Sequence, residues 1–309
     1  MQEGSITRRQ FMRSVTAAAA LAAASAARRM RAESRPFRVA LSVETLAGAN
    51  VNDARAAYRV WADEVARGLN MYHSEIIPEI FIPSAQMIQM IRGREVDCFA
   101  LTAWEYSKVM DEIDPAQMMV ENYAVDGMEY VLLVHASSPY KGIADLHGSK
   151  ILLHHHRDTI LLEAWLSILL LNANLSPADS FFEAIDKKDN MNEVILPLFF
   201  RRVPAIAITR RSYDTATELN PQLGKDLRVL AVSTPVVSDG FFFRLGCDPQ
   251  GKNQFQDALL RFTKLPAGRQ CLALYQSTGF FARPCSIMSG SLAMIHQYER
   301  LQKAPHRKA

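Results

Sequence analysis

Residues 85–101 read AQMIQMIRGREVDCFAL and place a short helix directly before an apolar strand. The apolar residues of Ala85–Ile91 recur at the spacing of one helix face, whereas Val96–Leu101 is apolar at nearly every position. A strand with apolar side chains on both faces is typical of a parallel sheet that helices cover on both sides. This stretch therefore predicts an α/β fold.

The same alternation of strands and helices continues in both directions along the chain. Toward the N-terminus, we expect a strand at Phe37–Val43, a helix at Asp53–Leu69 and a strand at Ile76–Ile82 that Pro78 interrupts. Toward the C-terminus, we expect strands at 129–135, 150–153, 205–208, 227–232 and 240–244, and helices at 159–171, 194–201, 212–220, 253–265, 267–275 and 289–301. This order predicts two lobes, each a mostly parallel sheet flanked by helices.

Two places along the chain are candidates for a crossing between these lobes. The first is the strand at 129–135, which follows the loop Asp126-Gly127, and the second is the pair of strands at 227–232 and 240–244. We therefore expect a discontinuous lobe 1 at 36–125 plus 236–302, a lobe 2 at 126–235 and a basic tail at 303–309. A cleft between the lobes, at the carboxyl ends of the strands, is where ligands of such folds bind.

The composition excludes several classes of protein. The chain has 309 residues, with 35 Lys and Arg against 32 Asp and Glu, and a formal net charge of +3. A nucleic-acid-binding domain would carry a stronger basic excess. Hydrophobic residues make up 49% and charged residues 22%, which is the composition of a globular protein rather than of a disordered or fibrous one.

Residues 1–27 have the pattern of an export signal. Thr7-Arg8-Arg9-Gln10-Phe11 is similar to the twin-arginine core, and the Ala-rich stretch Val15–Ala27 contains a small-residue cleavage site at Ala24-Ser25-Ala26. We expect a twin-arginine signal peptide and export to the periplasm. The alternative is an Ala-rich helix of the mature protein.

The four cysteines, at positions 98, 247, 271 and 285, fit no metal-binding or redox spacing. Cys98 lies in an apolar strand, so we expect a buried free thiol. The periplasm permits disulfides, and whether Cys247, Cys271 and Cys285 form one stays open.

Seven short stretches, in a fixed order, carry a family resemblance. They are FRVAL (37–41), IRGREVDCFA (91–100), SSP (137–139), IADLHGSK (143–150), RVPAIA (202–207), TKLPAGR (263–269) and GF (279–280). In their order and spacing, over roughly residues 37–285, the chain resembles the periplasmic solute-binding proteins of phosphate, phosphite and phosphonate ABC transporters. The resemblance implies a type II periplasmic binding fold with two lobes that close on a ligand. It also implies that hydroxyls and backbone N–H groups at a helix start hold the anionic oxygens.

The predicted helix that begins near Asp158 is the candidate for this anion site. Its first N–H groups have no partner within the helix, and they carry a partial positive charge. Where the family commonly has a Ser/Thr-rich run, this chain has His156-Arg157-Asp158-Thr159, so only one hydroxyl remains. We expect Arg157 to compensate by binding two oxygens of the ligand, and Asp158 to cap the helix.

Other polar and aromatic side chains follow the predicted strands and are candidates for the cleft wall. They are Ser42, Glu44 and Thr45, then Thr102, Trp104 and Tyr106, then His154 and His156, and finally Thr209. Trp104 and Tyr106 are equally well explained as packing residues. Successive strand residues alternate between faces, so at most two of the histidines at 154–156 point into one site.

One departure from the family concerns a ligand amine. The resemblance implies an acidic residue for such an amine at a strand end that here reads Ile208-Thr209-Arg210. This strand end contains no carboxylate, which argues against an aminoalkyl-phosphonate ligand.

These patterns together predict an exported solute-binding protein. We expect it to capture a small oxyanion, similar to phosphate, phosphite or phosphonate, for the permease of an ABC transporter, and to be a monomer. The sequence contains no nucleophile elbow or phosphate-binding loop, so we predict no catalytic residue, metal ligand or cofactor. The alternatives are the ligand-binding component of a membrane sensor, an enzyme similar to thiamine-pyrimidine synthases, or a metal-binding protein that uses the His154–His156 cluster.

Overall fold

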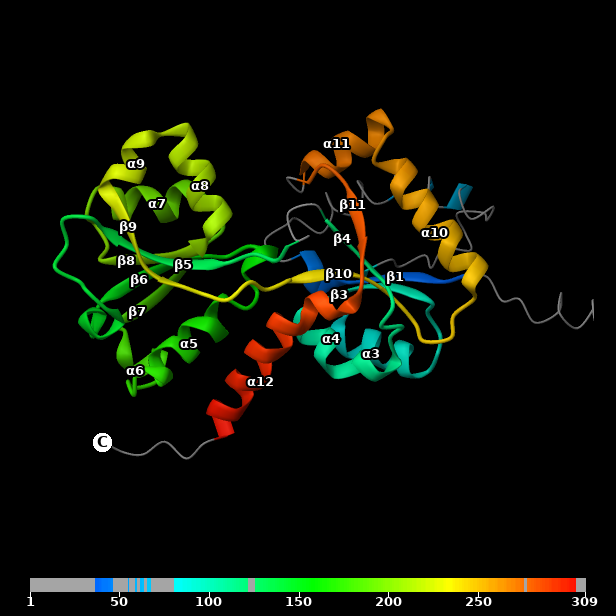
Figure 1. The fold of residues 1–309 in the computed structure, drawn as a ribbon, viewed down its shortest axis with the longest axis horizontal. Coiled ribbons are helices and arrows are strands. Elements are labelled where there is room, and N and C mark those ends of the chain that lie inside the picture. Colours follow the sequence, from blue (N-terminus) through cyan, green and yellow to red (C-terminus); the bar gives the residue numbers. More distant parts are fainter. Residues whose placement is uncertain are drawn as a thin grey trace, which may run out of the picture. The chain divides into compact units, whose positions relative to one another are not determined.

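Two β-sheets organise the chain (Figure 1). The structure is a computed structural model that describes residues 37–46, 55, 59, 62–63, 66–67, 81–121, 126–274 and 277–303. The first sheet has the strand order β11-β4-β10-β3-β1-β2, and the second has the order β7-β6-β8-β5-β9.

The first sheet takes its strands from both ends of the chain, namely β1 (Val39–Ser42), β2 (Phe81–Ile82), β3 (Cys98–Thr102), β4 (Met118–Glu121), β10 (Asp239–Phe243) and β11 (Phe280–Arg283). The second sheet takes its strands from the middle, namely β5 (Tyr130–His135), β6 (Lys150–His154), β7 (Ala184–Lys188), β8 (Ala205–Thr209) and β9 (Leu227–Val232). The chain therefore passes from the first sheet to the second after β4 and returns before β10.

The helices follow the strands in the same division. Those next to strands of the first sheet are α3 (Ser84–Arg92), α4 (Ala103–Val109), α10 (Pro249–Phe262), α11 (Pro266–Leu274) and α12 (Ser289–Lys303). Those between strands of the second sheet are α5 (Leu162–Asn172), α6 (Ala178–Phe181), α7 (Met191–Phe199), α8 (Arg210–Leu219) and α9 (Pro221–Asp226). Single 3₁₀ turns occur at η1 (Val43–Leu46), η3 (Met110–Glu112), η5 (Ile143–Leu146), η6 (Arg157–Thr159) and η7 (Cys285–Met288).

The predicted α/β class is confirmed, but both sheets are mixed rather than mostly parallel. β1 pairs in parallel with β2 and β3, and β6 pairs in parallel with β7 and β8. In contrast, β10 is antiparallel to β3 and β4, and β5 is antiparallel to β8 and β9. β5 and β10 are the strands with which the chain arrives from the other sheet. Because no helical crossover within the same sheet precedes them, nothing requires them to run parallel to their neighbours.

The sequence patterns did not predict three of the described strands, namely β4, β7 and β11. The clearest case is β7, which reads AIDKK and lies at the edge of the second sheet, with its residues half-buried or exposed. An edge strand of this kind needs no apolar face. Pro221 directly follows the predicted helix at 212–220, and it occupies the first turn of the additional helix α9, a position that proline tolerates.

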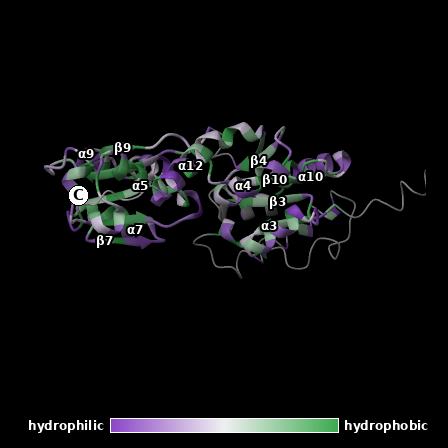
Figure 2. Ribbon diagram, turned by 90° about the horizontal axis from the view of Figure 1, so that it is seen from below, coloured by the Kyte–Doolittle hydropathy of each residue, from purple (hydrophilic) through white to green (hydrophobic). Residues whose placement is uncertain are grey.

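The inner strands form the core, and they are coloured as hydrophobic in Figure 2. All five residues of β3 and all five of β8 are buried. Cys98 is a buried free thiol, as predicted, and Cys247 and Cys285 are also buried and free.

Several predictions fall outside the described residues. These are the signal peptide at 1–27, most of the helix at 53–69, the first part of the strand at 76–82 and most of the basic tail. Within the part of the chain that the structure describes, no helix has both the length and the apolarity to cross a membrane.

The C-terminal helix α12 contacts helices that belong to both sheets. It packs against α4, which follows β3, and against α5, which follows β6. On one side, the ring of Tyr298 meets Trp104 edge to face, with centroids 5.8 Å apart. On the other side, Gln297 Nε2 donates a hydrogen bond to Asn172 Oδ1 at 3.1 Å. Helix α12 is therefore a third connection between the two sets of elements, in addition to the two crossings of the chain.

Candidate functional site

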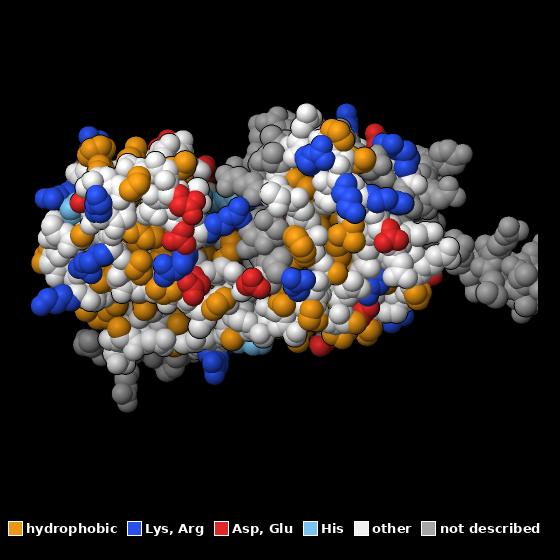
Figure 3. Space-filling view, turned by 45° about the horizontal axis from the view of Figure 1, so that its top comes forward, with side chains coloured by type: hydrophobic (Ala, Val, Ile, Leu, Met, Phe, Trp, Pro, Cys, Tyr) orange, Lys and Arg blue, Asp and Glu red, His pale blue; other side chains and the backbone are white. Residues whose placement is uncertain are grey.

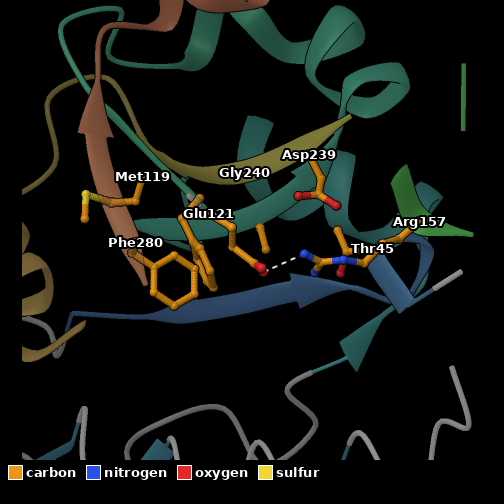
Figure 4. A pocket seen from close by; sticks show the side chains of 9 residues that line it. Thr45, Met119, Glu121, Arg157, Asp239, Gly240 and Phe280 are labelled. Carbon is orange, nitrogen blue, oxygen red and sulfur yellow. Dashed lines mark ion pairs between the residues drawn. The ribbon is translucent and has the colours of Figure 1, made fainter. Parts of the chain in front are cut away.

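Charged side chains from three segments meet beside the carboxyl end of β3 (Figure 4). Glu121 is the last residue of β4, and Asp239 is the first of β10, where it pairs with Thr102 of β3. Arg157 and Asp158 lie in η6, which follows β6 of the second sheet. Arg157 Nη2 lies 2.7 Å from Glu121 Oε1, and Arg157 Nε lies 3.6 Å from Asp158 Oδ1. We refer to Glu121, Arg157, Asp158 and Asp239 as the charged cluster.

Burial and the mutual interaction of these groups set their protonation. Burial acts to lower the pKa of Arg157, but the carboxylates of Asp239, Glu121 and Asp158 raise it, so the guanidinium stays charged. Burial raises the pKa of Asp239 to about 7, and Glu121 and Asp158 add to this effect although Arg157 opposes it. Burial also acts to raise the pKa of Asp158, but the hydrogen bond from His156 and the charge of Arg157 lower it. Three carboxyl groups therefore share one guanidinium.

The cavity at the cluster is nearly filled by its own side chains. Thr45, Glu121, Arg157, Asp239 and Gly240 are among the residues that line it (Figure 4), and its free volume is about 20 Å³. Such a volume holds roughly one water molecule. Because the Glu121 carboxylate occupies the guanidinium of Arg157, an oxyanion that binds here must displace or outcompete it.

The helix of the predicted anion site begins later than the sequence indicates. The helix does not begin near Asp158, because Arg157–Thr159 forms a single 3₁₀ turn and α5 begins at Leu162. Thr159 Oγ1 accepts a hydrogen bond from the His156 N–H and donates to the carbonyls of His154 and His156. The cap of this turn is the His156 ring, which accepts from the Asp158 N–H, and not the Asp158 side chain. These contacts use N–H groups that were expected to face an anion.

A groove of about 780 Å³ lies on the second-sheet side of the cluster, and we call it the His groove. It is lined by His154, His156, Asp158 and Thr209 together with residues of α7 and α8. The rings of His154 and His156 stack with centroids 5.5 Å apart, whereas His155 points elsewhere and pairs with Asp189 at 2.8 Å. The first N–H groups of α7 and α8 are already capped by the side chains of Asn190 and Thr209.

The pKa values of the two stacked histidines are shifted in opposite directions. Burial lowers the pKa of His154, and the charge of His156 lowers it further. Burial also acts to lower the pKa of His156. The hydrogen bond with Asp158 raises it, as do the charges of Asp158, Asp239 and Glu121. The neighbouring carboxyl groups thus favour the protonated form of His156, and burial opposes it.

Two of the predicted wall residues belong instead to a buried hydrogen-bond network. The Ser42 hydroxyl donates to Glu105 Oε1 at 2.5 Å, and both the backbone N–H and the hydroxyl of Thr102 donate to Glu105 Oε2 at 2.9 Å. Glu105 is 2% exposed, so this network fastens the start of α4 to β1. Neither hydroxyl lines the cavity of the cluster.

The remaining candidates are distributed over the structure. Trp104 Nε1 donates to the carbonyl of Ile160 at 3.1 Å and thus joins α4 to the segment after β6. Tyr106 stacks on Phe242 in the core, with centroids 4.7 Å apart, so it is a packing residue. Glu44 is exposed, while Thr45 lines the cavity of the cluster.

Residues that sequence patterns did not identify complete the site, above all Glu121 and Asp239. Glu121 belongs to the unpredicted strand β4, and Asp239 directly precedes a strand that was identified only from its phenylalanines. The available signal was a carboxylate at the end of a buried strand, in MMVE at 118–121 and in SDGFFF at 238–243. These carboxylates come from the first sheet rather than from the strand end at 208–210.

The charges on the face drawn in Figure 3 and the described histidines bear on nucleic-acid and metal binding, respectively. In the view of Figure 3, acidic and basic side chains are interspersed rather than gathered in one basic field. Among the described residues, no group of three or more His, Cys, Asp or Glu side chains is placed to hold a metal ion.

Substitution of Asp239 tests the electrostatics of the cluster. The pKa of Asp239 is about 7 in the folded protein and 3.8 in the unfolded reference. Between these pH values the folded state binds more protons, so the contribution of Asp239 to stability falls as pH rises, by up to about 1.4 kcal/mol per pH unit. We expect Asp239→Asn to flatten this slope from pH 4 to 7 and to be more stable than the wild type at pH 8. Urea unfolding at several pH values measures this, with the exposed Asp214→Asn as the matched control. Equal slopes for the wild type and Asp239→Asn would contradict the raised pKa.

Comparison with known proteins places this geometry in context. The model of a protein family described as the periplasmic substrate-binding protein of phosphonate ABC transporters matches residues 46–282. A search of curated protein sequences finds no match to the chain.

Solved structures share the fold at low sequence identity. A Xanthomonas citri protein bound to ATP is 15% identical with a TM-score of 0.59, and the match covers 89% of this chain and 100% of that one. The binding-protein component of a phosphonate transporter from Pseudomonas aeruginosa is 12% identical with a TM-score of 0.55, covering 87% and 88%. A Prochlorococcus marinus protein in complex with methylphosphonate is 10% identical with a TM-score of 0.56, covering 87% and 99%. At these identities the comparison establishes the fold alone.

Proposed function

Because the chain belongs to the family of periplasmic substrate-binding proteins of phosphonate ABC transporters, we propose that it captures a phosphonate, phosphite or phosphate at the charged cluster and delivers it to a membrane permease. Members of this family are transport components of the periplasm and not enzymes. Export through the twin-arginine pathway, as the pattern at 7–11 suggests, belongs to this proposal, as does a monomeric state.

The observation that carries the proposal is the buried guanidinium of Arg157 between two sheets. Its side chain is 9% exposed, and it reaches from η6 to Glu121 at the end of β4. A guanidinium binds two oxygens of a phosphonate at once, and it does so most strongly where water is excluded. In the structure, the Glu121 carboxylate contacts Arg157 where such an oxyanion would bind.

The proposed mechanism is that the two lobes predicted from the sequence close on the ligand at this site. We assign residues 36–125 with 236–302 to lobe 1 and residues 126–235 to lobe 2, so that Glu121 and Asp239 come from lobe 1 and Arg157 from lobe 2. The oxyanion replaces Glu121 at Arg157, and the rest of the ligand extends into the His groove, whose volume suits a small organic molecule. Because the ligand contacts both lobes, it shifts the population toward the closed state. The permease recognises this closed state.

Two structural relatives support the ligand class. The Prochlorococcus marinus protein holds methylphosphonate, and the Xanthomonas citri protein holds ATP, which also presents phosphoryl oxygens. We favour transport over sensing because the matching family is that of ABC transporter components.

The substitution Glu121→Gln tests the proposal. It removes the internal competitor for Arg157 and one negative charge while it preserves the shape of the side chain. We expect the affinity for methylphosphonate and phosphate to rise at least roughly tenfold, equivalent to about 1.4 kcal/mol. Isothermal titration measures the affinity, and thermal unfolding with and without ligand confirms it, because a ligand of the folded state raises its stability.

The matched control is Glu183→Gln, which removes the same charge from an exposed pair with Lys150. This variant is expected to bind as the wild type does. If methylphosphonate, phosphite, phosphate and sulfate all leave the unfolding temperature of the wild type and Glu121→Gln unchanged, the cluster is not an oxyanion site. If Glu121→Gln instead weakens binding of an aminoalkyl-phosphonate, Glu121 holds the amine of the ligand and the competitor role is wrong.

A further inference from the structure

A second pocket lies near the second sheet, at the opposite end of its strands from the charged cluster. It is formed by His135 at the end of β5, by the turn Ser137–Tyr140 and by the segment 201–204 that follows α7. In the antiparallel pair of β5 and β8, Val134 is the partner of Ala205, whereas Tyr130 at the other end is the partner of Thr209. The pocket is therefore at the Ala205 end of β8, and the His groove is at the Thr209 end.

The lining of this pocket is cationic. Arg201 and Arg202 belong to the lining, which includes neither Asp nor Glu among the described residues. The guanidinium of Arg202 lies 5.8 Å from the centroid of the Phe200 ring. The pocket has a volume of about 410 Å³, with Pro139, Val203 and Pro204 as apolar neighbours. In the charged cluster, by contrast, carboxyl groups outnumber cations.

Hydrogen bonds hold Arg201 and Ser137 beside His135 in the lining of the pocket. Arg201 Nε donates to His135 Nε2 at 3.3 Å, and an arginine nitrogen can only donate. The backbone N–H of Ser137 donates to His135 Nδ1 at 3.2 Å, and the Ser137 hydroxyl oxygen lies 2.9 Å from the same nitrogen. The Ser137 hydroxyl is therefore held at the pocket, next to the guanidinium of Arg201.

A second hydroxyl in the lining has no partner. Ser138 Oγ is buried and makes no hydrogen bond to any described residue. A buried hydroxyl without a partner destabilises the folded protein, so native proteins rarely keep one unless a ligand or water completes it. Both serines are thus available to the same occupant.

The backbone at Arg201 is left-handed, two residues after the end of α7. Arg201 has a φ of 58°, and its N–H bonds to the carbonyl of Leu198 at the end of α7. Glycine is the usual residue in this left-handed position, where a side chain costs stability. An arginine here projects its guanidinium to His135 and the pocket.

We propose that this pocket binds a small tetrahedral oxyanion, phosphate or sulfate, at a site separate from the ligand cleft. The guanidinium groups of Arg201 and Arg202 neutralise its charge, and the hydroxyls of Ser137 and Ser138 donate to its remaining oxygens. The site does not depend on the charged cluster, so it stands or falls independently of the function proposed above.

The test is a titration of the full chain with sodium phosphate and sodium sulfate at constant ionic strength, followed by backbone amide NMR shifts. The amides of Ser137, Ser138 and Arg202 report on the pocket, while those of Thr45 and Gly240 report on the cluster. We expect saturable shifts at the pocket, with an affinity that falls at least roughly tenfold in Arg201→Gly. Glycine suits the left-handed backbone, so this variant folds while it loses the guanidinium.

The matched control is Arg94→Gly, because Arg94 is an exposed arginine with a φ of 57° that follows α3 and lies outside the pocket. It is expected to bind as the wild type does. Ser138→Ala is expected to weaken binding severalfold without loss of stability, since its hydroxyl has no partner to lose. The proposal is overturned if the pocket amides show no saturable shift, if Arg201→Gly binds as the wild type does, or if Arg94→Gly weakens binding equally.

Discussion

Replacement of Arg157 by methionine is expected to lower the free energy of unfolding by about 3–5 kcal/mol at pH 7, because it leaves buried carboxyl groups without their counter-charge. Glu121, at 2.7 Å, loses its ion pair, and Asp158 and Asp239 lose the charge that balances them. Part of the loss is expected to return at pH 5, where Asp239, with its pKa of about 7, is protonated and the repulsion among the carboxylates weakens. Denaturant unfolding at both pH values measures the effect.

The control for this substitution is Arg210→Met. Arg210 pairs with Glu129 at 2.8 Å, but the two side chains are 34% and 36% exposed, so water replaces the lost partner. A cost of less than about 1 kcal/mol is expected, with little dependence on pH. Equal costs for the two arginine substitutions would mean that the charged cluster is not a buried network.

The substitution Asp97→Asn is expected to destabilise the protein by about 3–5 kcal/mol, because it leaves the Arg244 guanidinium buried without its counter-charge. Arg244 Nη2 lies 2.7 Å from Asp97 Oδ1, and the side chains are 10% and 6% exposed. Asp97 Oδ2 also accepts the N–H of Arg38 at 3.1 Å. One carboxylate thus holds together the segments before β1 and β3 and the residue after β10.

The measurement is again the free energy of unfolding, and the comparison is with the exposed Asp214→Asn, which is expected to change it by no more than about 0.5 kcal/mol. The variant with both Asp97→Asn and Arg244→Met is expected to recover part of the loss, since no unpaired buried charge remains. A double variant less stable than Asp97→Asn alone would contradict the ion-pair explanation.

The sequence predicted those strands whose own residues indicate that they are buried. Val96–Leu101 and Ala205–Ile208 are apolar at nearly every position, so they can only be buried strands, and they became β3 and β8. Elements whose stability comes from their neighbours left no comparable pattern. The edge strand β7, with Asp186, Lys187 and Lys188, exists because β6 offers it a partner.

The candidate site shows the same limit more sharply. The sequence predicted Arg157 as a ligand-binding cation, but it did not predict Glu121, which lies 36 positions earlier and pairs with that cation in the structure. An ion pair between distant segments leaves no local pattern in either segment. The helix start near Asp158 was wrong for a related reason, because the His156 and Thr159 side chains hold the chain in a 3₁₀ turn.

Helix α12 sets a mechanical limit on the proposed closing motion. It has 15 residues and is therefore a stiff rod of about 22 Å, in contact with α4 at one side and α5 at another. Two crossing strands alone would form a free hinge, but any rotation of one lobe against the other must also slide one of these helix interfaces. Packed helices slide by only about 1–2 Å before they must repack. For the proposed closing motion, these two interfaces favour a small opening angle and therefore compact ligands.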